Sequence, residues 1–127
     1  MAQRGFTLIE LCITTTLAGL LTALGVASYR TVLLRAHRSE ARIALLDIQA
    51  AQERHYLNAL RYSPELEKTH SPGARYRLSI ETDDAGQRYT ARAVPSPDSS
   101  QAADTACTEF TLRESGQRGG SSPECWP

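Results

Sequence analysis

The chain has few residues from which a catalytic or metal-binding site could be built. It has three cysteines and three histidines, and they form no C-x-x-C pair and no pair of neighbouring histidines. The spacing typical of metal ligands is therefore absent from the sequence. No arrangement of Ser, Cys or carboxylate residues around His55 or His70 indicates a catalytic triad, and we interpret both as surface or packing residues. The sequence therefore predicts neither an enzyme nor a protein that holds a cofactor or metal ion.

The chain also lacks a net charge. Its formal charge of +0 at pH 7 gives no general attraction to nucleic acid. Arg35, Arg38 and Arg42 would share one face of a helix, but no aromatic residues interleave with them for base stacking. We therefore expect a solvated face, or one that touches lipid headgroups and acidic neighbours, with a strip for nucleic acid as the alternative.

Proline and glycine are missing after Val26 until beyond Leu60, so nothing forces a helix to break there. Residues 6–29 are apolar apart from Glu10 and several hydroxyl residues, and a helix of this length crosses a hydrocarbon core. Apolar residues then recur at three- and four-residue steps, at Ala41, Ala44, Leu45, Ile48 and Ala51. The pattern predicts one helix from about Phe6 to about Leu60, apolar all round at first and on one face later.

The second half of the chain predicts a small β-sheet. Two alternating runs, 75–81 and 88–93, are joined by turn residues at 83–86, which is typical of a β-hairpin. A third strand is expected at 108–114, and the Gly-, Ser- and Pro-rich tail at 119–127 is not expected to hold itself in place. So small a globular part cannot bury the long helix on every side. A membrane, or a bundle formed with other subunits, must cover it.

The start of the chain differs from an ordinary secretory signal peptide. The small residue Gly5 precedes the apolar run, and nothing like A-x-A follows it at the usual distance. The residues G-F-T-L-I-E-L at 5–11 resemble the class III leader of type IV prepilins. This resemblance implies that a membrane aspartyl peptidase cuts between Gly5 and Phe6. It also implies that the new amine of Phe6 is methylated and that the apolar segment is kept as a permanent helix.

Glu10 is the acidic residue of that apolar segment. An ionised carboxylate costs roughly 2.5–3.5 kcal/mol near the centre of a bilayer and less near its edge, so it requires a cationic partner. Phe6 and Glu10 are four residues apart and share a helix face. The new amine can therefore pair with Glu10 of its own chain or of a neighbouring subunit, and the resemblance implies that the second pairing helps to place incoming subunits. The alternative is an interfacial Glu that only favours the positive helix N-terminus.

The cysteines are unevenly placed. Cys12 lies in the apolar run, where it would behave as a small apolar residue. Cys107 and Cys125 lie in the part of the chain expected to be exported, and two cysteines in an oxidising compartment predict a disulfide that ties down the tail. Counting the positive charges that flank the apolar run would instead place the C-terminal side in the cytoplasm. The cysteine pair and the leader type indicate the reverse, and we follow them.

Later segments extend the resemblance to PilE-type minor pilins. They are residues 52–56, A-V-P at 93–95, D-T-A-C at 104–107, and G-Q-R at 116–118 leading to C-W at 125–126. We therefore expect the α+β type IV pilin fold, a long N-terminal helix packed on a small antiparallel β-sheet. Its parts would be a removed leader (1–5), a transmembrane and filament-core half-helix (6–29) and a head domain (30–127). Many pilins carry a proline where this chain has Ala27, so local melting of the helix stays open.

The resemblance implies a structural subunit of a bacterial type IV pilus, a minor pilin. It would span the inner membrane once, meet a prepilin peptidase and methyltransferase, and join other pilins in an extracellular filament for pilus biogenesis, adhesion or twitching motility. A type II secretion pseudopilin is one alternative, although the C-terminal disulfide and the lack of a clear calcium-ligand arrangement at 95–104 disfavour it. A DNA-binding pilin used in uptake is the other. Residues 95–127 disfavour it, because their acidic residues outnumber Arg113 and Arg118: Asp98, Asp104, Glu109, Glu114 and Glu124.

Overall fold

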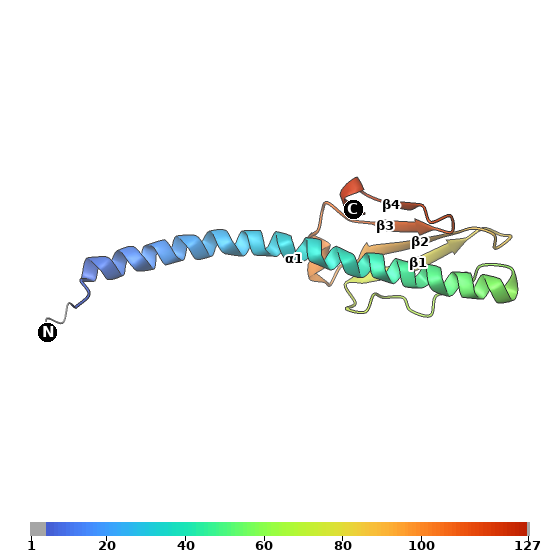
Figure 1. Cartoon of the computed structure of the whole chain (residues 1–127), viewed down its shortest axis with the longest axis horizontal. Helices are drawn as coiled ribbons and strands as arrows, with labels where there is room; N and C mark the ends of the chain where they lie inside the picture. The colour runs from blue at the N-terminus through green and yellow to red at the C-terminus, as the bar shows by residue number, and fades with distance from the viewer. Residues whose placement is uncertain (1–4, 127) are drawn as a thin grey trace. The chain divides into compact units, whose positions relative to one another are not determined.

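The computed structural model describes residues 5–126 and contains one long helix and one β-sheet (Figure 1). Residues 1–4, which make up most of the predicted leader, and residue 127 lie outside the described residues. The chain divides into two compact units, Met1–Leu33 and Leu34–Pro127. The helix α1 (Leu8–Ala59) contributes its first part to one unit and its remainder to the other.

The first unit consists of the apolar part of α1 and the short segment before it. Every residue from Gly5 to Val32 is exposed, including twelve large apolar side chains such as Leu8, Leu21 and Leu24. The hydroxyl groups of its threonines donate to carbonyl oxygens three or four residues earlier, at 2.7 to 3.1 Å in Thr14, Thr15, Thr16 and Thr22. These hydroxyls therefore need no water, and α1 is long and apolar enough to cross a membrane.

The second unit packs the rest of α1 against a 4-stranded antiparallel sheet of order β1-β2-β3-β4. The strands are β1 (Tyr76–Thr82), β2 (Tyr89–Pro95), β3 (Phe110–Arg113) and β4 (Arg118–Gly120). Alternate residues of β1 to β3 are buried against Ala41, Ala44, Leu45 and Ile48 of α1, as the helical and strand periods predict. They are Tyr76, Leu78, Tyr89, Ala91, Ala93, Phe110 and Leu112.

The predicted hairpin is present, and its register pairs Tyr76 with Pro95 and Thr82 with Tyr89. The helix is shorter than predicted at both ends. It begins at Leu8, and it ends at Ala59 because Leu60 takes a left-handed backbone conformation, φ 55, with its N–H donating to the carbonyl of Tyr56 at 2.8 Å.

The sequence did not predict a fourth strand, which residues 118–120 form beside β3. A Cβ on Gly119 would lie 2.6 Å from Thr111 Oγ1, and one on Gly120 would lie 2.6 Å from the carbonyl of Glu109. The two glycines therefore allow β4 to approach β3 closely. The indole of Trp126 donates to the carbonyl of Gly119 at 2.6 Å, and the disulfide between Cys107 and Cys125 closes the loop. The predicted disulfide is thus present, and the tail is held by more than that bond.

Candidate functional sites in the two units

The predicted cleavage junction lies just outside α1. Gly5, Phe6 and Thr7 are exposed and not helical, and a Cβ added to Gly5 would meet nothing within 4 Å. The fold itself therefore places no demand for glycine at this position. A requirement for glycine at position 5 would have to come from a partner protein that binds this segment.

Glu10 takes part in a capping box at the start of α1. The N–H and hydroxyl of Thr7 donate to Glu10 Oε2 at 3.1 and 3.0 Å, and the N–H of Glu10 donates to Thr7 Oγ1 at 3.3 Å. Sequence reasoning missed this role, although the T-x-x-E spacing before an apolar run is its usual signature. The carboxylate is otherwise exposed, so it can also accept from another donor.

Arg38 anchors α1 to the loop that follows β2. Its Nε and Nη2 donate to the two carboxylate oxygens of Asp104 at 2.7 and 2.8 Å, and Gln101 donates both to Asp104 and to the carbonyl of Leu34. Burial raises the pKa of Asp104, but hydrogen bonds and charge from Arg38 outweigh it and hold the pKa below its usual range. The predicted solvated face is wrong for Arg38, whose side chain is buried with its partner. Arg35 is exposed and Arg42 half-buried.

Two further side chains of α1 fix the connection between α1 and β1. Glu40 accepts hydrogen bonds from the Ser71 hydroxyl, the Gly73 N–H and Arg75, at 2.5 to 2.7 Å. Gln52 pairs with both backbone groups of Ser63, at 2.8 and 3.1 Å, much as a neighbouring strand would. Sequence patterns do not predict these contacts, because each partner is 11 or more residues away along the chain.

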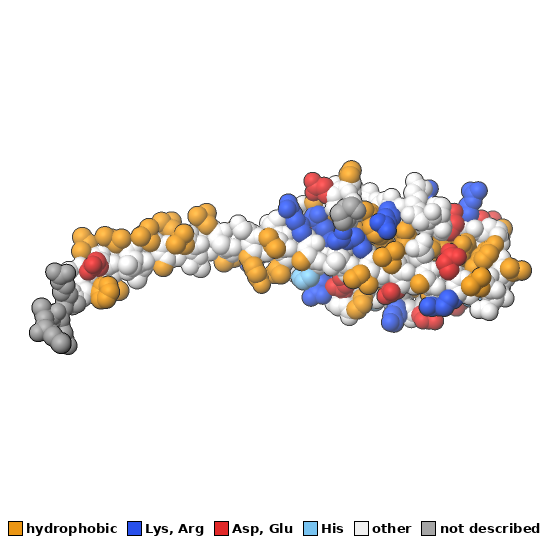
Figure 2. All heavy atoms as spheres, viewed as in Figure 1, with side chains coloured by type: hydrophobic (Ala, Val, Ile, Leu, Met, Phe, Trp, Pro, Cys, Tyr) orange, Lys and Arg blue, Asp and Glu red, His pale blue; other side chains and the backbone are white. Residues whose placement is uncertain are grey.

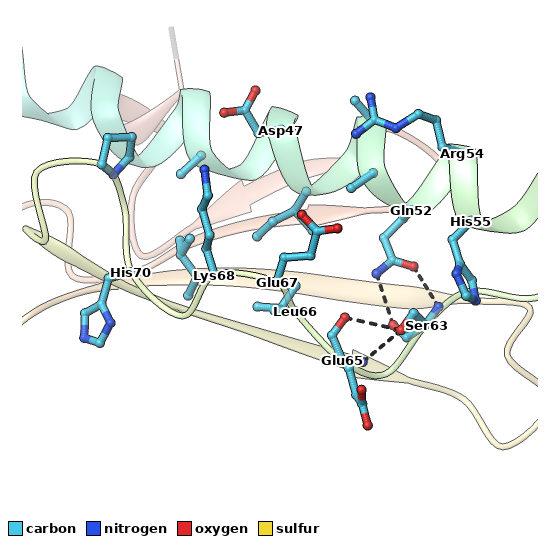
Figure 3. A pocket seen from close by; sticks show the side chains of 16 residues that line it. Asp47, Gln52, Arg54, His55, Ser63, Glu65, Leu66, Glu67, Lys68 and His70 are labelled. Carbon is cyan, nitrogen blue, oxygen red and sulfur yellow. Dashed lines mark hydrogen bonds between the residues drawn. The ribbon is translucent and has the colours of Figure 1, made fainter.

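A groove of about 380 Å³ lies between α1 and this connection (Figure 3). Its lining includes the apolar side chains of Ile48, Leu66 and Leu78. Charged side chains of both signs also line it, among them Asp47, Glu67 and Lys68 (Figure 3). His55 and His70 also line it but come from its two separate walls. No group of His, Cys, Asp and Glu side chains that could hold a metal ion occurs among residues 5–126.

The outer face of the sheet is polar and its centre is charge-paired. Arg92 donates to Glu109 at 2.7 Å and to Glu81 at 3.4 Å. Arg77 and Arg113 alternate with buried residues and are exposed on the same face. Figure 2 shows basic and acidic side chains interspersed over the second unit, whereas apolar side chains predominate in the first.

Residues 27–111 match the family model described as "Type IV minor pilin ComP, DNA uptake sequence receptor". The chain belongs to this family. It is a type IV minor pilin, and its function as a pilus subunit is the one expected from its first residues. Comparison with curated proteins gives no match.

Solved structures show the same fold. A type IV pilin from Shewanella oneidensis is similar with 23% sequence identity and a TM-score of 0.61, over 74% of this chain and 98% of that one. The non-core minor pilin PilV of Neisseria meningitidis is similar with 22% identity and a TM-score of 0.54, over 71% of this chain and 88% of that one. The predicted type IV pilin fold is therefore confirmed, while the finer PilE-type resemblance stays a prediction.

Proposed function

We propose that this minor pilin is made with a leader that a prepilin peptidase removes between Gly5 and Phe6. The amine of Phe6 is then methylated by a methyltransferase. The chain rests in the inner membrane as a single-pass protein until it joins other pilins in the filament. The observation that carries the proposal is the non-helical, exposed Gly5–Phe6 junction just before the exposed apolar part of α1, in a member of a minor pilin family. The surface of that helix needs a bilayer or other pilins to cover it.

Glu10 is the proposed assembly residue. It is the one charged side chain between Phe6 and Tyr29, and its carboxylate is exposed next to the helix start. After cleavage the amine of Phe6 lies four residues before Glu10 in the chain, just ahead of the first helical residue, Leu8. Pairing of Glu10 with the amine of a neighbouring subunit would neutralise both charges in the filament core, where an unpaired charge is costly.

The variant Glu10→Gln tests this role with the capping box preserved, because Gln can also occupy the third helical position of that motif. We expect normal membrane insertion and leader removal but several-fold less protein in sheared pili, measured by immunoblotting of the membrane and pilus fractions. Leu17→Gln is the matched control, because it places the same neutral amide elsewhere in the apolar segment without removing the charge of Glu10. Wild-type incorporation of Glu10→Gln would show that the charge is not needed.

Capture of DNA for uptake is a second candidate, favoured by the description of the matching family as a DNA uptake sequence receptor. The acidic balance of residues 95–127 disfavoured it. In the fold, however, Asp104 forms an ion pair with Arg38, and Glu109 forms one with Arg92. Both arginines lie outside that segment. Exposed Arg77 and Arg113 remain on the outer face of the sheet, so the surface is less acidic than the segment count indicates.

Fluorescence anisotropy with detergent-solubilised full-length protein tests this candidate. We expect tighter binding to a duplex that carries a DNA uptake sequence than to a scrambled duplex, with affinity that falls as salt rises. The double variant Arg77→Gln/Arg113→Gln should weaken binding to both duplexes, because phosphate contacts carry no sequence information. No binding, or equal binding to the scrambled duplex, would rule out the receptor role.

A further inference from the structure

The part of α1 in the second unit has two apolar faces, and the fold covers only one. Ala41, Leu45 and Ile48 face the sheet and are buried. On the opposite side Ile43 is 54% exposed, Leu46 40% and Leu57 80%. An ordinary amphipathic helix would carry charged residues there.

These outward residues follow the spacing of a coiled-coil seam. We call the outward positions 36, 39, 43, 46, 50 and 57 of α1 the outer seam; they are Ala36, Ser39, Ile43, Leu46, Ala50 and Leu57, all exposed. Steps of three and four residues bring them onto one stripe together with Glu53, which lies between Ala50 and Leu57 and is the one charged side chain of the pattern. The carboxylate of Glu53 accepts a hydrogen bond from the Tyr62 hydroxyl at 3.2 Å within the same chain.

The charges beside the outer seam differ between its two flanks. Arg35 and Arg42 lie on one flank, and Glu40 and Asp47 lie on the other. In a parallel pair of helices, a flank residue of one helix faces the residue five positions later on the partner. Arg42 and Asp47 are separated by that interval, and so are Arg35 and Glu40. Glu40 is already engaged by Arg75, but neither Arg42 nor Asp47 forms an ion pair among the described residues.

We propose that the outer seam pairs two copies of this chain, with their α1 helices parallel and Arg42 of each copy facing Asp47 of the other. The inference rests on the proposed function in one respect. Copies inserted by the same apolar segment have the same orientation, so their helices run in the same direction. The seam then presents the same apolar pattern on both copies with complementary charges beside it, and each sheet lies on the side of α1 away from the contact. This pairing precedes filament assembly.

Cysteine cross-linking of the full-length protein in membranes tests the pairing. The variants carry Cys12→Ser, so that the exposed thiol of the apolar segment does not react. They are expressed in cells without pilus-assembly machinery, so filament contacts are absent. We expect mild oxidation to convert Leu46→Cys into a covalent dimer at least five-fold more efficiently than His55→Cys, an exposed position of α1 on the groove side.

Charge exchange then separates a self-pair from contact with another protein. In the Leu46→Cys background, Arg42→Asp or Asp47→Arg alone should lower the dimer yield several-fold, and the two together should restore it. Equal yields at positions 46 and 55, an adduct with a different protein, or no rescue by the double exchange would overturn the pairing. Protein that is missing from the membrane fraction would contradict the proposed function instead. Retained protease resistance of the disulfide-closed tail verifies that each variant is folded.

Discussion

Arg38 has a structural role that its neighbours in the sequence do not indicate. Spacing placed it on a charged face with Arg35 and Arg42. The fold instead buries it against Asp104, a partner 66 residues away. A buried arginine is tolerated because both of its bonds to the carboxylate are short and Gln101 binds the same carboxylate. No periodicity in a single sequence identifies such a long-range pair.

Asp104→Ala should lower the free energy of unfolding by about 3–5 kcal/mol, because it leaves the Arg38 guanidinium buried without its partner. The double variant Arg38→Met/Asp104→Leu should recover much of that loss, since no buried charge remains. Urea unfolding followed by circular dichroism measures both. A double variant no more stable than Asp104→Ala would show that the ion pair itself, rather than the stranded charge, provides the stability.

The shifted pKa values of Asp104 and Glu40 determine how the stability of the fold changes at acid pH. Burial raises the pKa of both Asp104 and Glu40, but their hydrogen bonds outweigh it, so both pKa values lie below the ordinary ones. Groups of this kind contribute stability above their unfolded pKa values of about 3.9 and 4.3, and lose it as pH falls through the folded values. We expect wild-type protein to lose stability below about pH 4, and the Arg38→Met/Asp104→Leu variant to lose less over the same range.

At the scale of elements, the sequence predicted what depends on local pattern. The apolar run and its continuing period identified α1, and alternation around turn residues identified β1 and β2. β4 was missed because Gly119 and Gly120 have low strand propensity. They form a strand because β3, Trp126 and the disulfide lie beside them, which is a property of the tertiary structure.

The disulfide should stabilise this C-terminal element strongly. Cys107 and Cys125 are separated by 18 residues, and closing a loop of this size contributes about 3 kcal/mol in the chain-entropy model. Cys125→Ser should therefore lower the unfolding free energy by about that amount and expose the tail to trypsin at Arg118. Cys12→Ser is the matched control and should change neither. An unfolding free energy unchanged in Cys125→Ser would mean that β4 and Trp126 suffice to hold the tail.

At the scale of the whole molecule, the class of protein could be predicted from the sequence, but the distribution of charge on its surface could not. The first residues and the apolar helix already indicated a pilin, and the family match confirms a minor pilin. Counting charges by segment did not give the charge left at the surface, because Arg38–Asp104 and Arg92–Glu109 pair residues from distant segments. Which charges stay available to a partner is decided only when the fold brings those segments together.

Mass spectrometry of sheared pili, purified from cells that express the chain at its natural level, tests the central claim most directly. We expect a peptide that begins at N-methylated Phe6. We expect Gly5→Leu to abolish it while leaving the full-length chain folded in the membrane, since a Cβ added at Gly5 would meet nothing within 4 Å. A chain that begins at Met1 in the pilus fraction, or one that is cleaved correctly but never leaves the membrane fraction, would contradict the assignment as an assembled minor pilin.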